Sequence, residues 1–103
     1  MNPPPDDEIT DDTITIVDNP AANRYELRVA SELAAFTTYR LSPGRIVFIH
    51  TETLDGFAGH GLATRLARAE LDEARARGLR VVPRCPFVAK YIAEHPEYQD
   101  LVR

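Results

Sequence analysis

The sequence has little cysteine and no long hydrophobic run, and each absence excludes a class of protein. Cys85 is the only cysteine among 103 residues, which excludes an internal disulfide. No apolar stretch approaches the roughly 18 residues of a membrane-spanning helix, and no signal-peptide pattern is found. Cysteine and histidine nowhere cluster at metal-ligand spacing. We therefore expect a reduced, cytoplasmic protein with no membrane partner and no metal.

Basic residues are too dispersed for a nucleic-acid-binding surface. The net charge is -4 at pH 7, but six of the 16 acidic residues lie in the first 18 positions, which contain no basic residue. The rest of the chain carries all 12 basic residues and is slightly positive, so it can tolerate an anionic ligand. No stretch interleaves aromatic and basic residues like a base-stacking platform, and we expect no nucleic-acid partner.

Composition and periodicity predict one α/β domain after a short tail. Residues 1–12 combine prolines and acids and are predicted to be a disordered acidic tail, followed by a single domain over 13–103. Alternating residues predict strands, and helical spacings predict helices, in the order four strands, helix, strand, helix. The strands are expected at 13–20, 24–30, 32–41, 45–53 and 79–82, and the helices at 59–77 and 87–94. The result is a mixed, mainly antiparallel five-stranded sheet with two helices, in which the fifth strand is parallel to the fourth.

A glycine-rich loop leads into the first helix. Gly56, Gly59 and Gly61 let backbone N–H groups turn toward one point, and the helix dipole makes that point attractive to phosphate. The spacing inverts the dinucleotide fingerprint, and Leu62 and Ala63 stand where a P-loop has Lys and Ser or Thr. A phosphate cradle and a plain tight turn are both open at this point.

Cys85 lies between two prolines where a strand gives way to the second helix. Pro86 suits the first helical position, which puts Cys85 at the N-cap, where the helix dipole stabilises a thiolate. A lone cysteine is also commonly a small buried apolar residue. His50, near the end of the fourth strand, is expected to approach Cys85 and act as a base. The alternative for His50 is a strand histidine bonded to a backbone carbonyl.

The order strand, G-x-G loop, helix, strand and helix resembles the cofactor-binding half of the GNAT N-acetyltransferases. Residues 48–53 and 59–98 are similar to a group of very small members of that family. The resemblance implies a GNAT-like acyl-CoA N-acyltransferase fold, in which the loop cradles the pyrophosphate of acetyl-CoA and the fourth and fifth strands part to admit its pantetheine arm. The usual loop has Gln or Arg where this sequence has Gly56.

The resemblance also implies a function and a site. The chain would be an acetyl-CoA-dependent N-acetyltransferase that moves the acetyl group to a small amine or a protein lysine, directly or through acetyl-Cys85. Tyr91 and Tyr98 are candidates to protonate the leaving thiolate. The implied catalytic residues are Cys85 and His50, and the implied acetyl-CoA-binding residues are Gly56, Phe57, Ala58, Gly59, His60, Gly61, Leu62 and Ala63.

An alternative function follows from segments that the chain lacks. The helical pair that longer members place between the first two strands is absent, and this pair usually helps to shape the acceptor pocket. A non-catalytic acyl-CoA-binding or interaction module is therefore the alternative. Neither the acceptor nor the oligomeric state follows from the sequence.

Overall fold

The computed structural model of the chain describes residues 9–102. The strands are β1 (Ile14–Asn19), β2 (Arg24–Val29), β3 (Glu32–Ser42), β4 (Arg45–Thr53) and β5 (Arg80–Pro83). The helices are α1 (Leu62–Ala76) and α2 (Pro86–Glu94), with 3-10 helices η2 (Asp11–Thr13), η3 (Pro20–Ala22) and η4 (Pro96–Val102). The predicted order of strands and α-helices is confirmed. No helix in this described part is long and apolar enough to span a bilayer.

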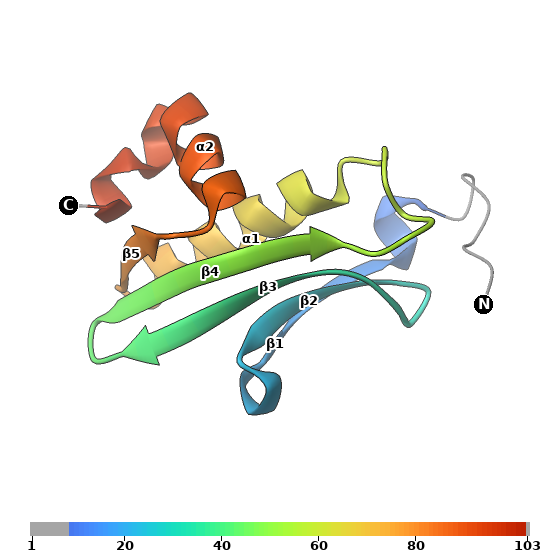
Figure 1. Cartoon of the computed structure of the whole chain (residues 1–103), viewed down its shortest axis with the longest axis horizontal. Coiled ribbons are helices and arrows are strands. Elements are labelled where there is room, and N and C mark those ends of the chain that lie inside the picture. The colour runs from blue at the N-terminus through green and yellow to red at the C-terminus, as the bar shows by residue number, and fades with distance from the viewer. Residues whose placement is uncertain (1–8, 103) are drawn as a thin grey trace.

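The five strands form one sheet in which spatial order equals chain order (Figure 1). The first four strands are antiparallel neighbours, and β5 lies parallel to β4. Helix α1 makes the crossover between these two strands, because parallel neighbours cannot be joined by a tight hairpin. The predicted fold class, a mixed and mainly antiparallel sheet with two α-helices, is confirmed.

The hydrophobic core lies between the sheet and α1, which runs behind β4 in Figure 1. In β2, the alternation predicted from the sequence places Tyr25, Leu27 and Val29 in this core. The opposing stripe of α1 includes Ala67, Leu71 and Ala74, spaced four and three residues apart. These two periodicities fix which face of each element is buried.

The C-terminal segment packs beside α1 through polar contacts. The Tyr98 hydroxyl in η4 donates a hydrogen bond to Asp72 of α1 at 2.6 Å. The guanidinium of Arg75 donates to both carboxylate oxygens of Asp100, at 2.8 and 2.9 Å. Helix η4 was not predicted, and these contacts explain why a segment without strong helical periodicity is ordered.

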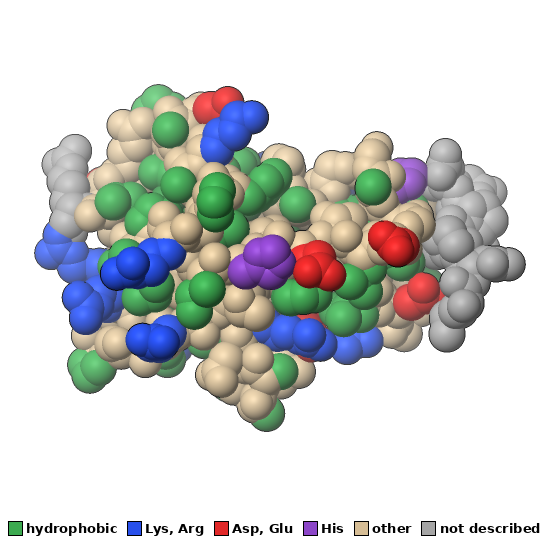
Figure 2. Space-filling model, viewed as in Figure 1, with side chains coloured by type: hydrophobic (Ala, Val, Ile, Leu, Met, Phe, Trp, Pro, Cys, Tyr) green, Lys and Arg blue, Asp and Glu red, His purple; other side chains and the backbone are tan. Residues whose placement is uncertain are grey.

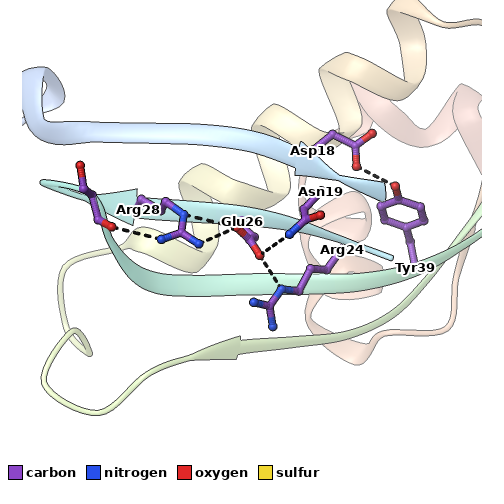
Figure 3. A network of polar contacts seen from close by, with 7 residues as sticks. Asp18, Asn19, Arg24, Glu26, Arg28 and Tyr39 are labelled. Atoms are coloured by element: carbon purple, nitrogen blue, oxygen red, sulfur yellow. Dashed lines mark hydrogen bonds and ion pairs between the residues drawn. The ribbon is translucent and has the colours of Figure 1, made fainter. Parts of the chain in front are cut away.

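A second charged cluster lies on the sheet face that α1 does not cover (Figure 3). Glu26 accepts hydrogen bonds from Arg24 at 2.7 Å, Arg28 at 2.9 Å and Asn19 at 3.0 Å. Burial alone would raise the pKa of Glu26, but these three donors outweigh it and hold the pKa at about 2. The uncovered face is therefore organised by charge around Glu26.

The folded region begins earlier than the predicted boundary at residue 13. Ile9 packs against the core, and Asp11 forms an ion pair with Arg65 of α1. Residues 9–12, assigned to the tail from their composition, are thus part of the described fold. The remainder of the predicted tail, residues 1–8, lies outside the described residues.

Candidate active site

The site begins where β4 and β5 part. Strand β5 pairs only with the first four residues of β4, and the last pair is Phe48 with Pro83. Because proline has no N–H to continue the ladder, the chain turns there, and the Cys85 N–H donates to the Phe48 carbonyl at 2.8 Å. Among residues 9–102, no strand pairs with the rest of β4, residues 49–53, on this edge.

Cys85 occupies the N-cap of α2, with Pro86 at the first helical position. The thiol is buried, with 1% of the residue exposed. Its Sγ atom lies 3.2 Å from Thr51 Oγ1, within hydrogen-bond distance. The N-cap position agrees with the sequence-based expectation, and the thiol points to a hydroxyl of β4 on the core side of the sheet.

A row of polar side chains continues from Cys85 into the core. Thr51 Oγ1 lies 3.0 Å from Thr37 Oγ1 on the neighbouring strand β3. Glu70 of α1 lies close enough to Thr37 to feel its hydroxyl. It is fully buried, and its carboxylate oxygens have no hydrogen-bond partner of standard geometry among residues 9–102. Burial raises the pKa of Glu70 to about 8, although the nearby Thr37 hydroxyl acts to lower it.

Glu70 was missed by sequence analysis, although a signal was present. It falls four residues after Leu66 and four before Ala74, both of which are buried. A carboxyl group on the buried stripe of an amphipathic helix is an exception to helical patterning.

His50 lies on the other face of β4. Its Nε2 atom is 3.2 Å from Glu52 Oε1, and its ring meets the edge of Phe36 at a centroid distance of 6.4 Å. Strict alternation after buried Phe48 would have turned His50 inward, toward Cys85. A bulge between the pairs Thr38–His50 and Tyr39–Phe48 adds one residue, Ile49, and inverts this pattern. The expected approach of His50 to Cys85 is therefore not found, and Thr51 takes that position.

The glycine loop borders a hollow of about 220 Å³. Gly59 and Gly61 have φ of +86° and +69°, and a Cβ atom placed on either would meet nothing within 4 Å. Gly61 is the N-cap of α1 and supplies no side-chain cap, so the first N–H groups of the helix lack that partner. The lining residues are Thr53, Phe57, Ala58, Gly59, Gly61, Leu62, Ala63, Thr64 and Phe87.

Six of the eight predicted acetyl-CoA-binding residues are therefore found together. Phe57 and Leu62 are buried, so mainly their backbone groups remain for a ligand. Gly56 and His60 do not line this hollow. Gly56, with φ of +89°, belongs to the turn that precedes it.

A second hollow, of about 490 Å³, lies over β3, β4 and the end of β5. Figure 2 shows basic side chains gathered at the end of the molecule where β3 turns into β4. The lining residues are Arg40, Ser42, Arg45, Val47, Ile49, Val82 and Arg84. Arg84 lines this hollow and Phe87 lines the glycine-loop hollow. In sequence, Cys85 therefore lies between a residue of one hollow and a residue of the other.

Comparison with known proteins identifies the family. Residues 24–101 match the model of the GCN5-related N-acetyl-transferase family. The chain belongs to this GNAT family. Three quarters of its length lies within the match, and the matched region contains every residue of both hollows.

Curated relatives of this GNAT protein include protein NATD1 from two vertebrates. The chain is 39% identical to NATD1 of Xenopus tropicalis over 54 residues, which are 52% of this chain and 50% of that relative. The chain is 37% identical to NATD1 of Mus musculus over 70 residues, which are 67% of this chain and 64% of that relative. The chain thus spans one half to just under two thirds of these relatives.

A solved structure supports the GNAT fold. The solution structure of a GCN5-like protein from Staphylococcus aureus superimposes with a TM-score of 0.66 at 24% identity. The match covers 86% of this chain and 87% of that protein. At this identity, the likeness concerns the fold.

Two tyrosines considered as acids in this GNAT protein have other contacts. Tyr98 donates to Asp72, and burial together with this hydrogen bond raises its pKa to about 12. Tyr91 stacks on His95 at a centroid distance of 3.8 Å, and burial raises its pKa. Tyr98 therefore has a structural role, whereas Tyr91 also lines a small hollow beside Phe87.

Glu70 should make the stability of the GNAT protein fall as pH rises. The unfolded carboxyl ionises near pH 4.5, whereas the folded one keeps its proton until about pH 8. The unfolded chain therefore binds fewer protons in this window, and the free energy of unfolding decreases by about 4 kcal/mol from this group. The substitution Glu70→Gln removes the ionisable group and with it this pH-dependent loss of stability. Urea denaturation from pH 4.5 to 8.5 should show that the free energy of unfolding of Glu70→Gln rises, relative to that of the wild type, as pH increases.

A matched control is Glu73→Gln, which changes an exposed glutamate of the same helix. Its stability curve should stay parallel to that of the wild type. If the Glu70→Gln curve is also parallel, the raised pKa is contradicted.

Proposed function

We propose that this GNAT protein is an acetyl-CoA-dependent N-acetyltransferase whose amine acceptor carries an anionic group. The observation that carries the proposal is the pair of hollows on either side of residues 84–87, one bordered by backbone N–H groups and one by arginines. Acetyl-CoA would enter from the glycine loop, and the acceptor would approach from the face with the arginines.

The donor side relies on backbone rather than side chains. Arg65, one turn into α1, is already paired with Asp11. The N–H groups of the loop and of the first turn of α1 are the groups left to hold a pyrophosphate, and the helix dipole adds to their attraction. Since a Cβ at Gly59 or Gly61 would project into open space, glycine leaves room for a phosphate to approach the backbone.

The acceptor side combines positive charge with apolar contacts. Arg40, Arg45 and Arg84 are exposed and have no ion-pair partner within residues 9–102. Val47 and Ile49 line the floor of the same hollow. A carboxylate or phosphate near the amine would neutralise the arginines, whose planar fork binds such groups in a bidentate manner. A lysine flanked by acidic residues is one acceptor of this class.

Two routes lead from this arrangement to an amide. In the direct route, the amine attacks the thioester carbonyl, the C–S bond breaks with CoA leaving as a thiolate, and His50, held by Glu52, takes the proton released by the amine. In the two-step route, the Cys85 thiolate attacks the thioester carbonyl, the C–S bond to CoA breaks, and CoA leaves as a thiolate. The amine then attacks acetyl-Cys85, gives up a proton, and releases the Cys85 thiolate. The buried thiol requires side chains at the gap to move in the second route.

Gly59→Val should weaken acetyl-CoA binding by at least about tenfold, because the side chain would fill the space through which a phosphate reaches the loop. Isothermal titration calorimetry measures the change. Gly44→Val is the matched control, since Gly44 has φ of +73°, open space around its Cβ position and a place in the β3–β4 turn. Both variants carry similar backbone strain. Equal affinity in folded Gly59→Val and wild type would argue against the cradle.

Intact-protein mass spectrometry with acetyl-CoA distinguishes the routes. The two-step route predicts an acetyl increment on the wild type that is absent from Cys85→Ala, whose turnover should be lost while its acetyl-CoA affinity stays within about twofold. Normal turnover by Cys85→Ala would exclude the covalent route. Tight binding with no acetyl-enzyme and no CoA release toward any amine would instead favour a non-catalytic acyl-CoA-binding module.

Arg84→Gln and Arg40→Gln should each raise KM for an anionic acceptor by about tenfold, the cost of losing one charge-assisted contact. Suitable probes are two lysine peptides that differ only in having glutamates or glutamines beside the lysine. The wild type should prefer the glutamate peptide, and the variants should lose this preference. Arg68→Gln, on the exposed side of α1, is the control. No preference in the wild type would refute the acceptor class.

A further inference from the structure

Glu70 is a deeply buried ionisable side chain for which neither route has a use. No part of it is exposed, and its carboxylate oxygens lack partners of standard geometry among the described residues. An unpaired buried carboxylate costs several kcal/mol, whereas an apolar side chain at this position of α1 would simply extend the core. The location of Glu70 therefore calls for an explanation.

Two threonine hydroxyls lie between Glu70 and the one thiol of the protein. Thr37 lies next to the carboxyl, Thr51 Oγ1 is 3.0 Å from Thr37 Oγ1, and Cys85 Sγ is 3.2 Å from Thr51 Oγ1. A hydroxyl donates one hydrogen bond and accepts up to two. All donors in the row can therefore point toward Glu70, or all can point toward Cys85.

We propose that Glu70 accepts the proton of the Cys85 thiol through the hydroxyls of Thr51 and Thr37. Once Glu70 has lost its own proton, which happens at about pH 8, the thiol gives its proton to Thr51, Thr51 gives its own to Thr37, and Thr37 gives its own to the carboxylate. One S–H bond is lost and one carboxyl O–H bond is formed, and each threonine ends as a hydroxyl. Glu70 touches no substrate and is a positioning residue. Use of the thiolate to attack acetyl-CoA rests on the proposed function, whereas the proton exchange does not.

The exchange keeps the charge of the buried site constant. A thiolate at Cys85 would add a second negative charge to the interior if the carboxylate stayed ionised. When the proton moves to Glu70, one negative charge replaces another, and the Thr51 hydroxyl is left to donate to the thiolate. His50 cannot take this role because it lies on the opposite face of β4 and pairs with Glu52.

The surroundings of Glu70 favour such an exchange. Its pKa is raised by burial and lowered by Thr37, and no charged side chain in residues 9–102 adds to these two influences. From the elements packed on α1, β3 presents Thr37 and β4 presents Thr51, both uncharged. A carboxyl whose pKa is raised to about 8 can release and take up a proton near neutral pH, as a proton acceptor in such an exchange must.

Carbon-13 NMR titration of the free protein tests the exchange without acetyl-CoA. Labelled cysteine gives a single Cβ signal, because the chain has one cysteine, and labelled glutamate reports Glu70 through its carboxyl carbon. Two coupled groups share the same macroscopic midpoints. We expect the Cys85 and Glu70 curves of the wild type to show two common steps between pH 5 and 10.

Variants break the row at each link. In Glu70→Gln, the Cys85 curve should become a single step. In Thr51→Val and Thr37→Val, loss of a hydroxyl from the row should weaken the coupling and bring the two steps closer together, while Thr51→Ser should restore the wild-type separation. Glu73→Gln serves as the control and should match the wild type. Amide spectra establish that each variant is folded, and the two valine variants keep the test valid if Glu70→Gln does not fold.

A single-step Cys85 curve that is the same in the wild type, Glu70→Gln and Thr51→Val would overturn the proposal. Acetylation of Cys85 by acetyl-CoA is measured separately, and in Glu70→Gln its rate should fall by about 100-fold with unchanged acetyl-CoA affinity. Shared steps in a wild type that never becomes acetylated would refute the covalent route and leave the proton exchange standing. Acetylation at the wild-type rate in Glu70→Gln would refute a role for the exchange in acetylation.

Discussion

The hydrogen bond from the Cys85 N–H to the Phe48 carbonyl is the contact on which the arrangement of the site depends. It is the last backbone link between β4 and the segment that follows β5. With proline at positions 83 and 86, the chain cannot continue pairing and instead enters α2. This one link sets where the sheet opens, where the thiol lies, and which side chains of β4 face the opening.

The opening gives the two faces of β4 different chemistry. On the core side, Thr51 leads through Thr37 to a buried carboxyl group. On the uncovered side, His50 and Glu52 meet solvent near the arginine-lined hollow. A one-residue bulge at Ile49 decides this division, because it exchanges the faces of all the residues that follow. Acid–base groups for a thiol and for an amine are thereby kept apart by a single strand.

Most of the fold could be predicted because alternation and helical spacing are local properties. The strands, both α-helices and the parallel β5 follow from these patterns, and the N-cap position of Cys85 follows from Pro86. The bulge was not predictable, since nothing at Ile49 distinguishes it from a regular strand residue, and the error about His50 follows from it. The Glu70 row was missed because it joins β3, β4 and α1, and only tertiary packing brings them together.

The sheet order has a consequence for how the protein folds. Strands β1 to β4 are hairpin neighbours whose contacts are close in sequence, whereas β5 reaches β4 only across the whole of α1. Contacts of large sequence separation pay the greater loop-closure entropy and tend to form late. The meander can therefore assemble while residues 84–87 are still remote from Thr51. A chain trapped at that stage would have nearly all of its sheet but would lack Cys85 beside Thr51, so ligand binding reports completion of folding better than strand content does.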